Sequence, residues 1–508
     1  MGMTAERTPL RLVEPGRFKA LREFLGEADF TEAGICRRLG IPSFNDFGDA
    51  RLGSRFPNGF ESPQDVLIRL FLGCETAQRS EVEHVLGCAA LELLEEAGLL
   101  EPDPADPGRS IAPVGLCPTR GLYLVSDRGP AASPQAGDLV YPAILENTQD
   151  FLNSIPDARC GSLLDLGTGT GVAALLAARD YAGHAWACDI TPRSAHFAEF
   201  NRRLNGIDNV TVARGDLYEA VGGRMFDRIV THPPYVPVSN PTWIFRDGGD
   251  DGETIVRRAI EGLPRHLAPG GRFCSLTLIS DRQDEPAESR VRAWLGDAGP
   301  EFDVAVIAET TRPPYDFVGR ALQKGVHKLD ELLYWNRIFR ERKVTYLVYG
   351  CVVIQRHAGE RKPFTIRLQK GPKSGRPETG WALGWNTAAA APDAGAVILN
   401  SRPRCSSHLH VAVLHRMREG RLVPQEFLLR AKYPFDAECK CPGWVIALIQ
   451  ECDGLKTGIE ALNLLREKGV LAPDLETGDF SDVLKLLLSS GFLEAECPGF
   501  PAVPVPRE

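Results

Sequence analysis

The 508-residue sequence contains no run of about 18 apolar residues, so no membrane-spanning helix is expected. Its first residues, Met-Gly-Met-Thr-Ala-Glu-Arg, lack the apolar stretch of a secretory signal, which favours a cytoplasmic protein. Positive charge is not in excess either, because the formal net charge is −9. This negative net charge argues against a protein with a broadly basic surface for nonspecific binding to duplex DNA, although a local basic groove is still compatible with it.

A regular cysteine framework is also missing. The 13 cysteines are odd in number and scattered, and Cys188, Cys274 and Cys351 lie inside apolar stretches. Such a pattern predicts reduced, buried thiols rather than disulfides. One group suits zinc by residue type: Cys405, His408, His410, Cys439 and Cys441. Because Cys-x-Cys spacing is less typical of zinc sites than Cys-x-x-Cys, we favour no metal, with buried thiols and surface histidines, over a structural zinc ion.

The chain is too long for a single hydrophobic core, and we expect three parts. The first part, residues 1–130, shows helical periodicity from about residue 16 to residue 100, with Ser62-Pro63 as one helix start and a capping box over residues 80–83. Two short strands are expected within residues 111–126. This order suggests a winged-helix-like module. It has no basic recognition helix, so we expect it to serve as a structural or partner-docking element.

In residues 131–357 strands alternate with helices, which predicts an α/β fold with a mostly parallel, seven-stranded sheet. The expected strands are residues 162–166, 184–189, 210–214, 226–231, 272–279, 302–308 and 344–354. A helix over residues 329–342 precedes the last strand, which we expect to be antiparallel.

Residues 358–508 are expected to form an α+β extension. A basic segment, residues 356–376, is interpreted as a solvated linker, with a nucleic-acid contact as the alternative. Residues 396–400 and 408–414 are predicted to be strands, and residues 444–494 to be three helices that resemble a second winged helix.

Two motifs carry the functional prediction. The first, Leu163-Leu-Asp-Leu-Gly-Thr-Gly-Thr-Gly171, is an apolar strand that leads into a glycine-rich turn and a helix. The second, Thr231-His-Pro-Pro-Tyr235, follows a later strand. In this order they resemble class I S-adenosylmethionine (SAM) methyltransferases that act on planar nitrogens. The segment from Arg246 to Arg258 is similar to the release-factor glutamine methyltransferase subgroup, and the whole resemblance covers residues 135–357.

The resemblance implies SAM as cofactor and a set of residues that hold it. Gly167, Thr168, Gly169 and Gly171 form the turn that lets the backbone approach the donor. Asp165 would hold the ammonium group and Asp189 the ribose hydroxyls; Asp216 would accept from the adenine amino group, beside the backbone of Leu217. An NAD-binding site is the alternative interpretation of such a turn, but the glycine spacing here is Gly-x-Gly-x-Gly rather than the Gly-x-Gly-x-x-Gly of NAD sites.

The second motif is expected to bind the methyl acceptor. In the family an Asn or Asp side chain and the first proline carbonyl accept hydrogen bonds from the target NH₂, and an aromatic ring stacks on it. Pro233, Pro234 and Tyr235 match this pattern, whereas His232 replaces the Asn or Asp. A neutral imidazole can accept one hydrogen bond, but it can also act as a general base or merely orient the turn.

The leading prediction is therefore methylation of a side-chain amide or amine of a protein. The alternatives are an exocyclic amino group of nucleic acid, a small metabolite, or a regulatory protein that binds SAM without turnover. No membrane partner is expected, and the sequence does not determine the oligomeric state.

Overall fold

The computed structural model describes residues 8–49, 59–128, 137–239, 243–324, 329–472 and 474–506. The chain divides into two compact units: Met1–Leu278 with Val326–Phe339, and Ile279–Gly325 with Arg340–Glu508. Within the described residues, no helix has the length and apolar character needed to cross a membrane. The predicted boundary between residues 130 and 131 lies outside the described residues.

The N-terminal part of the first unit is mainly helical. Its elements are α1 (Pro15–Glu27), α2 (Glu32–Leu39), η1 (Phe44–Asp49), α4 (Pro63–Leu67), η2 (Ile68–Leu72), β1 (Thr76–Gln78), α5 (Arg79–Leu86), α6 (Cys88–Glu96), β2 (Glu101–Asp103), β3 (Asp106–Ile111), β4 (Gly115–Thr119) and β5 (Leu122–Ser126). As expected, Ser62 caps α4 by accepting from the Asp65 N–H at 3.3 Å. The capping box predicted at residues 80–83 is wrong, because α5 follows β1 directly and Ser80 already lies in its first turn.

This helical part shares a hydrophobic core with the rest of the first unit. Phe18 of α1 packs edge-on against Phe200 of α9 (Pro192–Asn205), with ring centroids 5.1 Å apart, and both side chains are buried. The Asn201 side chain accepts from the backbone N–H of Val125 in β5 at 2.7 Å. These contacts fix α9, the helix that follows the second strand of the sheet.

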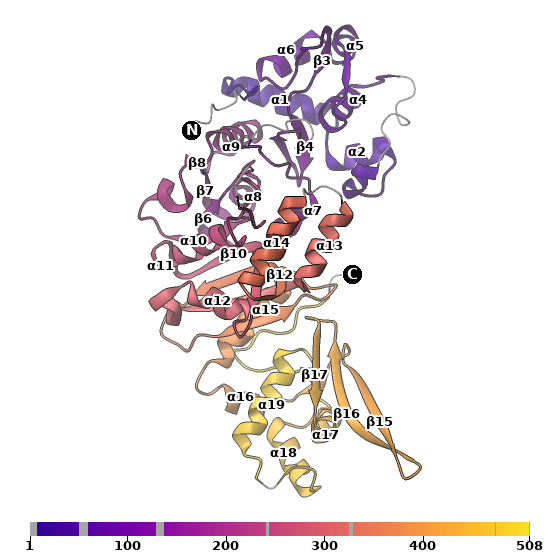
Figure 1. Cartoon of the computed structure of the whole chain (residues 1–508), viewed down its shortest axis with the longest axis vertical. Helices are drawn as coiled ribbons and strands as arrows, with labels where there is room; N and C mark the ends of the chain where they lie inside the picture. Colours follow the sequence, from indigo (N-terminus) through magenta and orange to yellow (C-terminus); the bar gives the residue numbers. More distant parts are fainter. Residues whose placement is uncertain are drawn as a thin grey trace. The chain divides into compact units, whose positions relative to one another are not determined.

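Five parallel strands form the sheet of the first unit, in the order β10-β9-β6-β7-β8. They are β6 (Cys160–Leu166), β7 (Ala182–Asp189), β8 (Val210–Arg214), β9 (Phe226–Thr231) and β10 (Leu267–Arg282), which belongs to both units. The other elements here are α7 (Glu146–Ser154), α8 (Val172–Asp180), η3 (Leu217–Val221), α10 (Thr254–Glu261) and α11 (Leu263–His266). Figure 1 shows β6, β7 and β8 beside α8 and α9. The carboxyl ends of β6, β7, β8 and β9 meet at one edge, where ligands bind in open α/β sheets.

In the second unit β11 (Phe302–Arg312) pairs with β12 (Val344–Arg356) antiparallel and with β13 (Thr365–Gln369) parallel. The sheet order β13-β11-β12-β10-β9-β6-β7-β8 has eight strands, which are the seven expected within residues 131–357 and one more. The extra strand is β13, which lies inside the basic segment predicted to be a linker. Nearby are α12 (Ala287–Ala293), η4 (Gly296–Glu301), α13 (Pro314–Lys324) and α14 (Leu329–Glu341), of which α14 lies mostly in the first unit.

The C-terminal part contains α15 (Arg376–Ala389), α16 (Ala394–Asn400), β14 (Arg404–Cys405), β15 (His410–Arg418), β16 (Arg421–Ala431), β17 (Ala437–Cys441), α17 (Gly443–Glu451), α18 (Gly458–Glu467), α19 (Thr477–Ser489) and β18 (Leu493–Glu494). The three helices predicted within residues 444–494 are present. The strand predicted at 396–400 is wrong: this short apolar run belongs to α16, which contacts α18 and α19 (Figure 1). A short buried apolar run does not distinguish helix from strand by periodicity.

Candidate active site

The glycine-rich turn after β6 has three glycines in the left-handed region. Their φ angles are 71° at Gly167, 55° at Gly169 and 85° at Gly171. A Cβ atom on Gly167 or Gly169 would meet nothing within 4 Å, whereas on Gly171 it would lie 3.2 Å from Cβ of Ala198. Gly171 is therefore required both by its backbone conformation and by packing against α9. Gly167 and Gly169 are required by conformation alone, and the space beside them is open to a ligand.

Asp165 lies at the end of β6 and is 2% exposed. Its Oδ2 accepts a hydrogen bond from Thr168 Oγ1 at 2.5 Å, within the turn itself. Burial raises the pKa of the Asp165 carboxyl to about 7, although the Thr168 hydroxyl opposes this shift. The carboxyl is thus balanced between its neutral and ionised forms near neutral pH, and a bound cation would favour the ionised form.

Asp189, the last residue of β7, connects two strand ends. Its Oδ2 accepts from the Gly169 N–H at 3.0 Å, and its Oδ1 accepts from the N–H and the hydroxyl of Thr191 at 3.0 and 3.2 Å. Burial raises the pKa of Asp189, and the N–H donors of Thr191 and Gly169 oppose the rise. The carboxylate therefore holds the glycine-rich turn in place, at the strand end where the cofactor is predicted to bind.

Asp216 and Leu217 follow β8. The Arg258 guanidinium, from α10, donates to Asp216 Oδ2 at 2.8 Å, and the Asp216 N–H donates to the Glu219 carboxylate at 3.3 Å. Leu217 has a φ of 51°, which is uncommon for a residue with a side chain. The chain thus turns sharply at the position where the sequence predicts an adenine contact. The role of Arg258 in holding Asp216 was not predicted.

The predicted acceptor motif leaves the end of β9 next to the end of β6. Thr231 Oγ1 donates to the Leu166 carbonyl at 2.8 Å, so the residue before His232 is tied to the residue before the glycine turn. The His232 ring lies 5.3 Å from the Phe151 ring and 6.1 Å from the Tyr235 ring, between centroids. Burial lowers the pKa of His232 to about 4, so its imidazole is neutral at physiological pH.

A second glycine-rich segment packs against the backbone that follows His232. The Val236 N–H donates to the Arg246 carbonyl at 3.0 Å, and the Gly248 N–H donates to the Val236 carbonyl at 2.8 Å. A Cβ atom on Gly248 would lie 2.8 Å from the Pro234 carbonyl oxygen, and one on Gly252 would lie 2.5 Å from the Tyr235 carbonyl oxygen. Close backbone approach, rather than a turn alone, therefore requires these glycines.

Helix α14, which comes later in the chain, supports the same loop. The buried Trp335 indole donates to the Pro237 carbonyl at 2.7 Å, and the Tyr334 hydroxyl donates to the Asp250 carbonyl at 2.9 Å. Glu331 forms an ion pair with Arg246. The sequence predicted this helix but not these contacts. The only local feature of the sequence that indicated them was an aromatic residue on an amphipathic helix.

The residues considered as zinc ligands form no such cluster in the part of the chain that the structure describes, where no three His, Cys, Asp or Glu side chains could hold a metal ion. Cys439 and Cys441 are on β17, Cys405 is on β14 and His410 begins β15. All 13 cysteines are free thiols.

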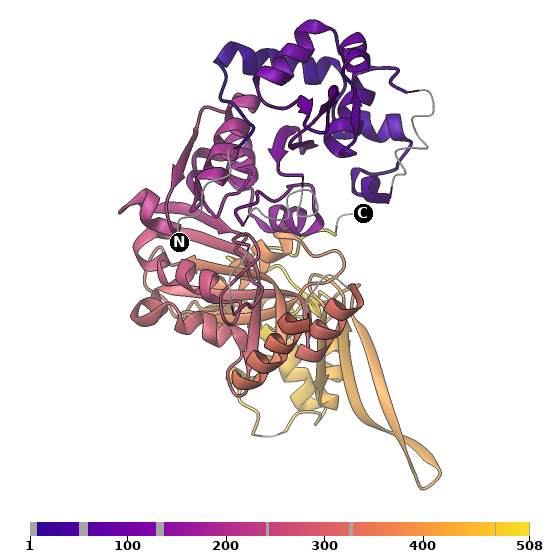
Figure 2. The same ribbon diagram turned by 45° about the horizontal axis from the view of Figure 1, so that its top comes forward.

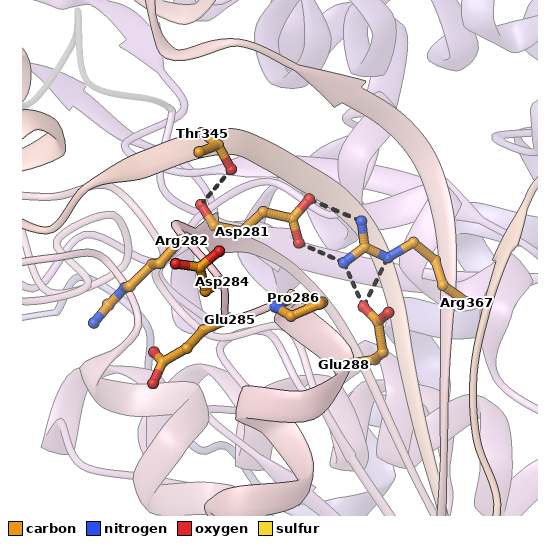
Figure 3. Close-up of a pocket in the computed structure, with 8 residues that line it drawn as sticks. All are labelled: Asp281, Arg282, Asp284, Glu285, Pro286, Glu288, Thr345 and Arg367. Carbon is orange, nitrogen blue, oxygen red and sulfur yellow. Dashed lines mark hydrogen bonds and ion pairs between the residues drawn. The ribbon is translucent and has the colours of Figure 1, made fainter.

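The basic segment 356–376 is not a solvated linker, because acidic partners hold most of its cations. The pairs are Arg356 with Glu301, Arg361 with Asp303, Lys370 with Glu309, and Arg367 with both Asp281 and Glu288. Figure 3 shows Arg367 reaching from β13 to the two carboxylates at the wall of an open acidic cavity. Burial alone would raise the pKa of Asp281, but the Arg367 guanidinium and the Ala287 N–H, which both donate hydrogen bonds to its carboxylate, together lower that pKa. The cavity wall is therefore an internal ion-pair network that fixes β13.

The parallel sheet, the glycine turn after its first strand and the acids at the next strand ends define a class I SAM-dependent methyltransferase core. Residues 144–286 match the methyltransferase small domain family. A Methanocaldococcus jannaschii protein named "Putative protein N5-glutamine methyltransferase" is 33% identical over 141 residues, which cover 26% of this chain and 71% of that protein. The chain therefore belongs to this methyltransferase family.

Two further relatives act on components of translation by name. The ribosomal protein uL3 glutamine methyltransferase of Bradyrhizobium diazoefficiens is 35% identical over 160 residues, which cover 29% of this chain and 50% of that protein. The release factor glutamine methyltransferase of Gloeobacter violaceus is 32% identical over 142 residues, which cover 25% of this chain and 49% of that protein. The chain thus spans about half the length of these two enzymes.

Proposed function

We propose that the chain transfers a methyl group from SAM to the nitrogen of a side-chain amide of a protein. The observation that carries the proposal is the neutral His232, which begins a Pro-Pro-Tyr loop tied to the glycine-rich turn through the Thr231–Leu166 hydrogen bond. The names of the relatives support a glutamine side chain as acceptor.

The residues at the edge of the sheet fit SAM. The space beside Gly167 and Gly169 admits the amino-acid end of the donor, and Asp165 would hold its ammonium group. Asp189 would accept from the ribose hydroxyls, and Asp216 with Leu217 would contact the adenine. When bound, SAM supplies an electrophilic methyl group on a sulfonium.

The acceptor loop would position the amide nitrogen. An acceptor nitrogen of the neutral His232 ring and the Pro233 carbonyl would each accept a hydrogen bond from the NH₂ group. Tyr235 would pack against the plane of the amide. With both N–H bonds held, the nitrogen lone pair points toward the methyl group, so catalysis would be mainly positioning. The new N–C bond replaces the S–C bond, and the nitrogen loses one proton to solvent.

The proposal is tested by incubating the chain and a cell extract with methyl-labelled SAM. Samples are then divided and treated with protease or nuclease, and the macromolecular label is counted. We expect protease, not nuclease, to release the label, and Tyr235→Ala to lower it while SAM affinity measured by calorimetry persists. Label in nucleic acid or in small molecules would contradict a protein acceptor. Tight SAM binding with no label in any fraction would identify a non-catalytic SAM-binding protein.

A further inference from the structure

The β15–β16 hairpin extends beyond the other elements of its unit. Figures 1 and 2 both show its tip clear of β17 and the helices of the C-terminal part. All nine residues of β15 are exposed, and β15 is the edge strand of its three-stranded sheet. The two-residue turn, Glu419 and Gly420, has φ angles of 48° and 76°, as expected for a tight hairpin turn. A ribbon with two exposed faces buries little of its own surface, so its side chains are available to a partner.

Three arginines gather on one face of this tip. Arg418 is directly opposite Arg421, and Arg416 is two residues before Arg418 on the same strand. Directly opposite residues share a face, and so do residues two apart. No hydrogen bond or ion pair joins these three guanidinium groups to any residue within the described ranges. Only Glu419 brings a negative charge into the tip, residues 415–424.

Three other exposed cations of the same unit are paired with acids. Arg430 pairs with Glu438 at 2.7 Å, Lys440 with Glu426 at 2.8 Å, and Arg404 with Glu494 at 2.9 Å. The basic segment 356–376 is also mostly neutralised. The arginines of the hairpin tip therefore form a local positive field in a chain whose formal charge is −9.

The opposite face of the tip is apolar. Met417 lies directly opposite Leu422, and the two side chains are 62% and 66% exposed. His415 lies opposite Pro424 on the same face. The tip thus combines long cationic side chains with apolar side chains that can contact sugars or enter between base steps.

We propose that the β15–β16 tip binds the phosphodiester backbone of nucleic acid. The major groove of B-form DNA admits a two-stranded ribbon, and a guanidinium binds a phosphate of DNA or RNA with two parallel hydrogen bonds. A chain of phosphates neutralises three neighbouring arginines together, whereas a protein surface would need three carboxylates placed to match them. The inference rests on the hairpin alone and does not depend on the proposed methyl transfer.

The test measures binding of the full chain to fluorescently labelled nucleic acids by anisotropy. The probes are duplex DNA, duplex RNA and single-stranded RNA, each of about 20 nucleotides per strand, with the chain at up to about 100 µM, the weak end of nonspecific binding. Comparing the three probes distinguishes DNA from RNA as the source of the phosphates. If three phosphates are neutralised, log K should fall against log salt with a slope of about −2.7 for duplex DNA and about −2.1 for single strands. Between 50 and 200 mM salt, the duplex DNA slope corresponds to about a 40-fold loss of affinity.

The decisive variant is Arg416→Gln, Arg418→Gln, Arg421→Gln, and we expect it to lose at least about tenfold in affinity and most of the salt dependence. The control, Arg404→Gln, Arg430→Gln, Lys440→Gln, removes the same number of positive charges from paired positions and should bind as the native chain does. Circular dichroism and SAM affinity should be unchanged in both variants. Equal binding by the tip variant and the native chain would overturn the proposal. So would absence of binding to all three probes, or a concentration-dependent self-association that only the tip variant loses.

Discussion

The lowered pKa of His232 leads to a sharp prediction about the pH dependence of methyl transfer. With a pKa of about 4, the ring is neutral over the physiological range. At pH 7 the neutral form exceeds the protonated form by about a thousandfold, since three pH units separate them. The native rate should therefore be insensitive to His232 titration between pH 5.5 and 8, and fall only as pH approaches 4. A general base with the ordinary pKa of about 6.5 would instead make the rate fall below pH 7.

The same reasoning predicts the effect of His232→Asn. If the ring only accepts a hydrogen bond, the Asn carbonyl can replace it, and the rate should stay within about tenfold of the native rate, the worth of one hydrogen bond of about 0.5–1.5 kcal/mol. Loss of a general base would cost about 10²–10⁴-fold. The assay is the initial rate of labelling of the protein fraction at saturating SAM, with SAM affinity measured separately. An Asn variant as inactive as His232→Ala, or a native rate that titrates near pH 6.5, would refute the hydrogen-bond role.

Three further predictions concern the donor edge and the loop that faces it. Asp189→Ala and Gly169→Val should each weaken SAM binding by more than tenfold in calorimetry. The Asp189 variant loses charged hydrogen bonds worth about 1.5–3 kcal/mol each, and the valine at position 169 fills the open space beside the turn. Undiminished SAM affinity in both variants would contradict the predicted donor site. Because the pKa of Asp165 is about 7 and a bound ammonium favours the ionised acid, SAM affinity should rise several-fold from pH 5.5 to 7 with proton release, and Asp165→Asn should abolish this dependence. Trp335→Phe should lower turnover and speed hydrogen exchange around Pro237 without changing SAM affinity, because it removes the hydrogen bond to the Pro237 carbonyl. The control is Trp381→Phe, which should not change turnover. The Trp381 indole is also buried, but its N–H has no hydrogen-bond partner within the described residues.

The parts of the fold that the sequence predicted best are those with local signals. Two strands, β8 and β9, have the predicted bounds, because each is a short apolar run that ends at a polar or turn residue. The donor turn was predictable for the same reason: three glycines in five residues are compatible with few backbone conformations. The division at residues 130 and 357, and the winged-helix character of both terminal parts, stay predictions.

Contacts between distant segments were not predictable from single stretches of sequence. The basic segment 356–376 looked like a linker because its acidic partners, such as Asp281 and Glu288, lie far away in the chain. The lowered pKa of His232 depends on burial beside Phe151, which precedes it by 81 residues. Charge and periodicity within one window carry no information on either pairing.

Two regions contact the loop that would hold the methyl acceptor, and only one of them lies within the residues that match the family. The glycines at 248 and 252, which approach Pro234 and Tyr235 closely, lie inside the matched residues 144–286. Trp335, which donates to the Pro237 carbonyl, lies outside them, on a helix that interrupts the chain between β11 and β12. A change in α14 can therefore move the acceptor loop without touching the donor site. We therefore expect methyl-donor binding to follow the family, and the position of the acceptor loop to depend in part on a helix to which the family match does not extend.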